Sequence, residues 1–154
     1  MSVDTAYPER NDRSLARLRR VIGEMPQDRW TDAVDGDWTA GALLAHMAFW
    51  DRFVRARWEH AHRTRAIVPV EIDLGMADLV NDASLPSWAL IPPRAAADMA
   101  VTAAELTNAV IAALDNHAIE AVIAGGWDTL IDRSLHRDAH LAALERHLSP
   151  RELG

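Results

Sequence analysis

The chain has 154 residues, of which 49% are hydrophobic and 25% are charged, and these values exclude a disordered or collagen-like protein. A chain of this length can bury a sizeable core, so we expect a single domain spanning residues 1–154. The formal net charge is −7 and the basic residues form no long run, which argues against a nucleic-acid partner. Cysteine is absent, which excludes disulfides, thiolate metal ligands and a cysteine nucleophile supplied by the chain.

The N-terminal stretch MSVDTAYPERND is polar and acidic. It lacks the basic start and the apolar middle of a secretory signal. Further along, no apolar run approaches the roughly 20 residues of a membrane span. We therefore expect a cytoplasmic protein that does not associate with membranes.

The first part of the chain predicts two helices. In NDRSLARLRRVIGEM, apolar residues recur three and four positions apart, the pattern of one buried helical stripe formed by Leu15, Leu18, Ile22 and Met25. Pro26 ends this helix. A loop with the turn formers Asp35, Gly36 and Asp37 follows, and Thr39 is the expected N-cap of a second helix over residues 39–62.

The second part of the chain predicts a long connection and two more helices. Residues 64–93 contain four prolines and no sustained period, which indicates a crossover with one short helix near residues 76–81. Pro93 suits the first turn of a third helix over residues 93–117, with a predicted stripe of Met99, Ala103, Leu106, Val110 and Leu114. After the break at Gly125 and Gly126, a fourth helix over residues 127–147 is predicted to bury Ile131, Leu135, Leu141, Leu144 and Leu148.

Four amphipathic helices without a convincing alternating strand predict an all-α fold. The expected architecture is an antiparallel four-helix bundle with one long crossover between helices two and three. The apolar helix faces also leave room for a homodimer, although the sequence does not indicate which face pairs.

Near the end of the chain, the stretch SLHRDAH places His136 and His140 four residues apart. Residues four apart on a helix lie one turn above each other, so both imidazoles can share an ion that binds ring nitrogen at about 2.0–2.1 Å. The alternative is a pair of solvated surface residues. The pair indicates a metal site only if a third ligand comes from elsewhere.

His46 is the candidate third ligand. It lies in the middle of LLAHMAFWD among large apolar residues, so its ring is expected at or beside the buried stripe, where it needs a polar partner. A carbonyl or carboxylate partner would also satisfy the ring. Because metal sites in bundles are built from inward side chains on facing helices, we favour a site of His46, His136 and His140 that leaves further positions open.

The other four histidines are better explained as residues of helix ends. His60 and His62 fall at the predicted end of the second helix and His117 at that of the third, where an imidazole can bond the last carbonyls. His147 lies roughly 10 Å beyond His140 along the same helix, so it is a similar capping candidate.

Several other residues are candidates for the surroundings of the site. Asp132 precedes His136 by four residues and can orient that ring by accepting its second N–H, or else it is an exposed acid. Asn81 and Asp82 lie in the crossover and are weaker candidates for ligand contact. Four tryptophans could wall a pocket, although most are expected simply to pack in the core: Trp50, Trp58, Trp88 and Trp127.

Two segments carry a resemblance to a known family. DWTAGALLAHMAFWDRF resembles the second helix of the DinB superfamily of metal-binding four-helix bundles, and SLHRDAHLAALE resembles its last helix, with an HxxxH pair. The order and lengths of the helices are similar over nearly the whole chain. The resemblance implies the family's histidine triad at His46, His136 and His140. It also implies a thiol transferase or isomerase, because the family includes enzymes that use mycothiol or bacillithiol, such as the maleylpyruvate isomerases.

A divalent ion, zinc or nickel, on three neutral imidazoles can lower the pKa of water to about 7 or deprotonate a coordinated thiol. Because the chain has no cysteine, a thiol would have to arrive on a small cofactor, and the resemblance implies one of the mycothiol or bacillithiol class. Arginines such as Arg52 or Arg94 are candidates to bind the sugar or carboxylate groups of this cofactor. Two alternatives remain: a hydrolase in which the ion activates water, and a non-enzymatic protein that binds a small molecule.

Overall fold

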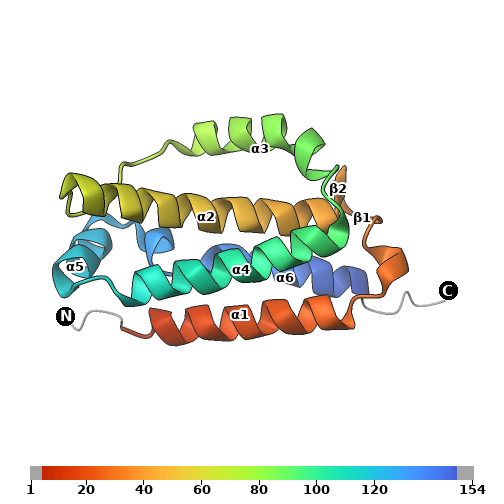
Figure 1. Ribbon diagram of the computed structural model, residues 1–154, viewed down its shortest axis with the longest axis horizontal. Coiled ribbons are helices and arrows are strands. Elements are labelled where there is room, and N and C mark those ends of the chain that lie inside the picture. The colour runs from red at the N-terminus through yellow and green to blue at the C-terminus, as the bar shows by residue number, and fades with distance from the viewer. Residues whose placement is uncertain (1–4, 149–154) are drawn as a thin grey trace.

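A computed structural model describes residues 5–148. Its described residues contain six α-helices (Figure 1): α1 (Tyr7–Glu24), α2 (Ala40–Thr64), α3 (Leu74–Trp88), α4 (Pro93–Ala112), α5 (Asn116–Gly125) and α6 (Ser134–Leu148). Two short 3-10 helices and one hairpin accompany them: η1 (Gln27–Arg29), η2 (Asp128–Leu130), β1 (Ala33–Asp35) and β2 (Trp38–Thr39). The predicted all-α class is confirmed.

The long helices α1, α2, α4 and α6 lie side by side, and α3 lies on the outer side of α2 (Figure 1). α1 packs against α4 and α6, and α2 packs against α3, α4 and α6. Because α3 returns the chain to the end of the molecule where α2 begins, α2 and α4 run in the same direction (Figure 1).

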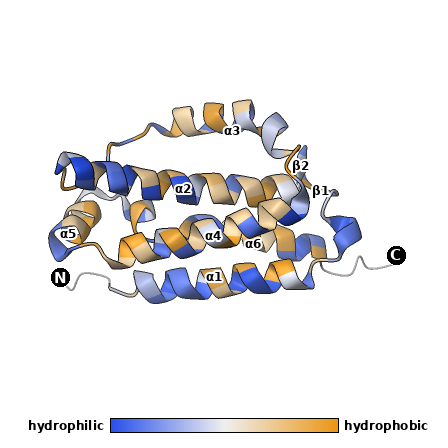
Figure 2. Ribbon diagram, viewed as in Figure 1, coloured by the Kyte–Doolittle hydropathy of each residue, from blue (hydrophilic) through white to orange (hydrophobic). Residues whose placement is uncertain are grey.

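Within residues 5–148, no single helix has both the length and the apolar composition to cross a membrane, and α4 and α5 pass that test only as a pair bent by 106°. In Figure 2, α1 is hydrophilic over most of its length, with separate hydrophobic positions. These positions include the predicted core residues Leu15 and Leu18, which are confirmed as buried.

The connection between α2 and α4 holds a longer helix than the sequence predicted. We expected a short helix at residues 76–81, whereas α3 spans Leu74–Trp88. Its start is fixed by Asp73, whose side chain accepts a hydrogen bond of 3.3 Å from the N–H of Met76, an N-cap that the prediction overlooked. Pro86 lies near the end of the helix, so it does not stop α3 early.

The predicted third helix is in fact two helices. We expected it to extend from residue 93 to 117, whereas α4 ends at Ala112 and α5 begins at Asn116. The side chain of Asp115 accepts a hydrogen bond of 2.8 Å from the N–H of Ala118, which caps α5 and marks a new start. The apolar period continues across this junction, so hydrophobicity alone does not reveal the break.

The loop before α2 contains a hairpin that the sequence did not predict. β1 and β2 pair antiparallel with Ala33 opposite Thr39, and Gly36 at the turn has a φ of 54°, which favours glycine. Thr39 is confirmed as the N-cap of α2, because its hydroxyl accepts a hydrogen bond of 3.1 Å from the N–H of Ala42. The hairpin therefore leads directly into the helix that carries His46.

Small side chains fill the contact between α2 and α4. The buried face of α4 consists of Ala96, Ala97, Ala100, Ala103, Ala104, Thr107 and Ile111. Small residues let two helices approach closely, which favours this face over a bulkier one. The predicted stripe of this helix is therefore correct at Ala103 and wrong at Leu106, which is 46% exposed.

The last helix begins later than predicted. We expected a helix from residue 127, whereas α6 begins at Ser134, after η2 and a turn. The side-chain oxygen of Asn11 accepts hydrogen bonds from the N–H groups of Arg133 (2.7 Å) and Ser134 (3.2 Å), so α1 caps this start. Leu135 was predicted to be buried but is 54% exposed, because Arg137 occupies the inward position. Three predicted core positions are confirmed: Ile131, Leu141 and Leu144.

A buried ionic cluster joins α2 to α6. Asp51 Oδ1 accepts a hydrogen bond of 2.8 Å from Arg133 Nε, and Asp51 Oδ2 accepts one of 2.7 Å from Arg137 Nε. The side chains are 2%, 4% and 0% exposed, respectively. Arg137 also donates to the side chain of Asn108 at 2.9 Å. Such buried charges are stable only with satisfied partners, so the cluster restricts α6 to one register against α2.

We expect Asp51→Asn to destabilise the protein by about 3–5 kcal/mol, because it leaves two buried guanidinium groups without a carboxylate. The free energy of unfolding is measured by urea titration followed by circular dichroism. The matched control is Asp82→Asn, at an exposed position of α3, for which a change within about 0.5 kcal/mol is expected. Equal stability of the two variants contradicts the assigned role of Asp51.

Candidate metal centre

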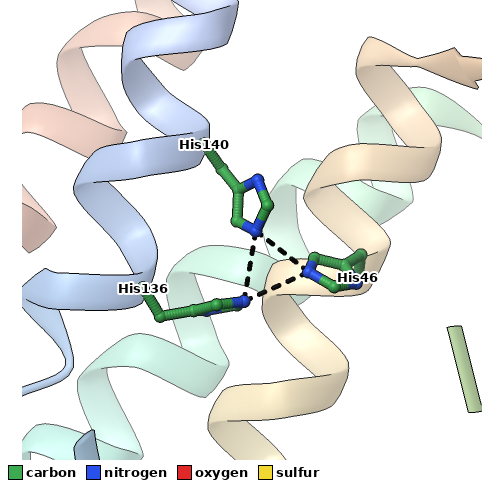
Figure 3. Close-up of side chains that lie close together, drawn as sticks. All are labelled: His46, His136 and His140. Atoms are coloured by element: carbon green, nitrogen blue, oxygen red, sulfur yellow. Dashed lines mark hydrogen bonds between the residues drawn. The ribbon is translucent and has the colours of Figure 1, made fainter. Parts of the chain in front are cut away.

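Three imidazoles from two helices converge on one point (Figure 3). His46 extends from α2, and His136 and His140 extend from α6. The Nε2 atom of His46 lies 3.1 Å from that of His136 and 3.0 Å from that of His140, and the last two are 3.2 Å apart. His46 is 5% exposed and the other two are half-buried. The structure thus brings together the three histidines that the sequence singled out.

The spacing of these nitrogens fits a shared cation. Nitrogens bound to one ion at about 2.0–2.1 Å are separated by roughly 2.8–3.4 Å when the angle at the ion is octahedral or tetrahedral. The three observed separations fall within that range. The group could therefore hold a metal ion. Three protein nitrogens form an incomplete coordination shell, which is the donor set of an open site rather than a closed structural one.

Aromatic packing orients His46. Its ring meets Trp38 edge-on at a centroid distance of 5.2 Å and Trp88 at 5.4 Å, and Trp50 lies at 6.4 Å. Its Nδ1 atom is buried and has no hydrogen-bond partner among residues 5–148. The ring is therefore positioned by the surrounding tryptophans rather than by a hydrogen bond from its far nitrogen.

All three rings are held in the neutral form. Burial lowers the pKa of His46 from 6.5 to about 3; the charge of His140 and then that of Arg133 add to this effect, and Asn81 opposes it. Burial also lowers the pKa of His136, with a further contribution from Arg133, and burial lowers the pKa of His140. Neutral imidazole is the form that binds a metal, so the site is ready to bind at pH 7.

The histidines form part of the wall of a cavity of about 560 Å³, a size suited to a small organic molecule. Segments of α2, α3, η2 and α6 and the connection before α3 enclose it. Its lining is largely apolar: Trp50, Phe53, Val54, Pro69, Ile72, Leu74, Ala77, Trp127 and Leu130. Its polar and charged lining consists of Arg57, Glu71, Asn81, Thr129, Arg133 and the three histidines, and Gly126 completes the wall.

Asp132 does not orient His136, so that prediction is wrong. Asp132 is 4% exposed, which also excludes the alternative of an exposed acid, and its carboxylate accepts hydrogen bonds from Arg10 Nε at 2.6 Å and from Ser134. The Nη2 atom of Arg133, not Asp132, lies 3.4 Å from the Nδ1 atom of His136. Residue 132 precedes the first turn of α6, so the i, i+4 geometry of a helix does not apply to it.

The tryptophans divide between the cavity and the core. Trp50 and Trp127 line the cavity, as predicted. Trp88 is buried against His46 and is not among the lining residues. Trp58 belongs to the core, where its Nε1 donates a hydrogen bond of 2.9 Å to the carbonyl of Leu130.

The predicted polar candidates have mixed outcomes. Asn81 lines the cavity and accepts a hydrogen bond of 2.8 Å from Trp50 Nε1, whereas Asp82 is exposed and does not line it. Neither Arg52 nor Arg94 lines the cavity, so the prediction that these arginines bind the thiol cofactor is wrong. Arg52 is exposed, and the guanidinium of Arg94 lies over the ring of Trp30, 5.0 Å from its centroid.

The remaining histidines lie away from the candidate site. His60 and His62 are exposed at the end of α2, the location predicted for them. His117 lies in the first turn of α5 rather than at the end of the preceding helix, so its predicted capping position is wrong. His147 lies near the end of α6, where its Nε2 is 3.6 Å from a carboxylate oxygen of Asp32.

Four residues that shape the site were not predicted: Trp38, Asp51, Arg57 and Arg133. One signal for Arg133 was present in the sequence. Arg133 and Arg137 are four apart, like the two histidines, and each arginine precedes one histidine by three residues, which places the four side chains on adjoining sectors of one helix. The sequence did not reveal that this arginine pair is buried, because an isolated arginine is normally exposed.

Comparisons of the chain with protein-family models, with curated proteins and with solved structures find no match. A function is therefore inferred from the residues of the cavity and from the resemblance carried by two helical segments.

We expect the metal-free protein to lose stability as the pH falls from 6.5 to 5. The unfolded chain takes up protons at its histidines near pH 6.5, whereas the folded chain resists protonation because the pKa of His46 is lowered to about 3. Well below pH 6.5 but still above the folded-state pKa of about 3, His46 alone contributes a slope of about 1.4 kcal/mol per pH unit. The measurement is urea unfolding at a series of pH values in the presence of a chelator.

His46→Asn is expected to reduce this slope, whereas His60→Asn, at an exposed position of the same helix, leaves it unchanged. An equal slope in the two variants contradicts the neutral, buried state assigned to His46.

Proposed function

We propose that the protein is a metal-dependent enzyme of the DinB type, in which His46, His136 and His140 bind one divalent ion, zinc or nickel. In this proposal α1, α2, α4 and α6 constitute the family's four-helix bundle and α3 lies in its crossover. The observation that carries the proposal is the convergence of three Nε2 atoms, 3.0–3.2 Å apart, on the wall of a cavity. The resemblance of both ligand-bearing segments to the family supports the same assignment.

When bound, such an ion supplies a Lewis acid that can lower the pKa of water to about 7 or deprotonate a coordinated thiol. The protein's own residues prepare the site. α2 and α6 hold the rings at a fixed separation, and burial keeps them neutral. Apolar side chains such as Trp50, Phe53 and Leu130 reduce the water content of the cavity, which strengthens electrostatic interactions inside it.

We propose that the nucleophile is a low-molecular-weight thiol of the mycothiol or bacillithiol class and that its partner is a small electrophile. The chain contains no cysteine, so a second molecule has to bring the sulfur to the histidines. The thiol gives its proton to water, and the thiolate attacks the electrophilic carbon. The sulfur–carbon bond forms as the bond from that carbon to the leaving group breaks, and the leaving group departs with the electron pair of the broken bond. With water in place of the thiol, the same residues support hydrolysis, which is the alternative.

We expect the purified protein to contain close to one equivalent of zinc or nickel, as measured by elemental analysis. His46→Ala and His140→Ala should each reduce metal affinity by more than the 10–100-fold that the loss of an outer-shell partner typically costs. Affinity is measured by competition with a chromogenic chelator.

His60→Ala is the matched control, because His60 is an exposed histidine of α2 outside the cluster, and it is expected to bind metal like the unsubstituted protein. Full metal retention in His46→Ala rules out the proposed ligand set.

The metal-loaded protein is expected to conjugate mycothiol or bacillithiol to members of a panel of small electrophiles, and a chelator or His140→Ala should abolish this turnover. Loss of the free thiol is followed with a thiol-reactive dye, and the same preparations are tested on esters and amides. Turnover of esters or amides without thiol consumption selects the hydrolase alternative. Inactivity in both panels, with the metal in place, argues for a binding protein.

A further inference from the structure

The cavity carries a positive charge, although the chain as a whole carries −7. Its charged lining residues are Arg57, Arg133 and Glu71, with histidine counted as neutral as in the formal charge of the chain. Glu71 is exposed, whereas Arg133 is buried. The lining therefore has a formal charge of +1, with the buried part of that charge located next to His136.

The partners of Arg133 leave one of its nitrogens available to the cavity. Nε donates to Asp51 at 2.8 Å and Nη1 donates to the carbonyl of Thr129 at 2.8 Å. Among residues 5–148, the hydrogen-bond contact of Nη2 is a long one of 3.4 Å to Nδ1 of His136. Asp51 is shared with Arg137, so one carboxylate faces two guanidinium groups and the cluster retains a formal charge of +1. Such a buried positive charge favours an additional anionic partner.

Arg57 supplies a second cation to the same cavity. Its guanidinium lies over the ring of Phe53, 5.7 Å from the centroid, and donates to the carbonyl of Val70, which fixes it at the cavity wall. Burial lowers the pKa of Arg57, the positive charge of Arg133 lowers it further, and Glu71 opposes the shift. Both arginines line the same cavity and the charge of one disfavours that of the other, so an anion bound near them would relieve that repulsion.

We propose that Arg57 and Arg133 form an anion subsite beside the histidine cluster, and that the cavity takes a small carboxylate with an apolar body. The carboxylate would bind the arginines with charge-assisted hydrogen bonds, and the apolar body would lie against Trp50, Trp127 and Leu130. As a statement about the substrate, this inference rests on the proposed metal-dependent function. As a binding site, it requires only the arginines and the apolar wall.

The test compares phenylacetate with the neutral phenylacetamide, which has nearly the same shape. Binding is followed by tryptophan fluorescence, because Trp50 and Trp127 line the cavity, using protein as purified and protein stripped with a chelator. In both preparations we expect phenylacetate to bind at least about tenfold more tightly than phenylacetamide.

Arg57→Met and Arg133→Met are each expected to weaken phenylacetate binding about tenfold and to change phenylacetamide binding less than about twofold. Arg52→Met is the matched control, because Arg52 is an exposed arginine of α2 outside the cavity. Arg133 also bonds Asp51, so circular dichroism checks its fold; if that variant unfolds, Arg57→Met decides the test.

The subsite is rejected if phenylacetate binds no more tightly than phenylacetamide, or if the preference for phenylacetate is lost when the metal is removed. It is also rejected if Arg52→Met weakens phenylacetate binding as much as Arg57→Met does. Selectivity that persists in stripped protein supports the subsite even if the metal proposal fails. Metal-loaded protein that lacks selectivity rejects the subsite and leaves the metal proposal intact.

Discussion

The arrangement of the site depends on one buried carboxylate. Asp51 of α2 bonds Arg133, the residue immediately before α6, and Arg137 within α6. Each of the two histidines on α6 follows one of these arginines by three residues. Fixing the arginines therefore fixes the histidines, and α2 contributes His46 one and a half turns before Asp51. An apolar contact of the same volume is often at least as stable as a buried ion pair. We infer that the charges are present because they specify a single register of α6 against α2. Leucine and alanine side chains on the same surface would be interchangeable and would not specify one register.

Burial, which makes it unfavourable to place charges in the interior, also determines the protonation state of the three imidazoles. A ring enclosed by tryptophans, with a guanidinium close by, cannot take up a proton easily. Protons therefore compete weakly with a cation for the three Nε2 atoms, even below the pH at which an exposed histidine is half protonated. The low pKa of the buried imidazoles has two effects. It keeps the three rings unprotonated in mild acid, and it makes the folded protein less stable at low pH, because histidines of the unfolded chain have ordinary pKa values and take up protons.

The three histidines of the candidate site could be predicted from the sequence because their signals are local and chemically unusual. A histidine inside an apolar helical stripe needs a partner, and a pair spaced by four residues offers one, so His46, His136 and His140 could be grouped from the sequence alone. The buried arginines could not be found in this way, because their burial depends on Asp51, a residue more than eighty positions away. The start of α5 was missed for a related reason, because a cap residue such as Asp115 begins a new helix without interrupting the hydrophobic pattern. The hairpin was missed because its strands span only three and two residues, too few to show an alternating pattern.

The cavity is lined by the three histidines, by the arginines Arg57 and Arg133, and by apolar side chains. Helix α3 contributes to the apolar part of this lining. The hydrogen bond from Trp50 to Asn81 ties α3 to α2 beside the histidine cluster, while Leu74 and Ala77 add apolar surface from the same helix. The ionic cluster that orients the ligands contains no residue of α3. Substitutions at Leu74 or Ala77 can therefore reshape the cavity without disturbing the ionic cluster, whereas Trp88 of the same helix packs against the ring of His46. In the proposed function, metal binding belongs to the contact between α2 and α6, and residues of α3 contribute to the selectivity for the apolar body of a ligand.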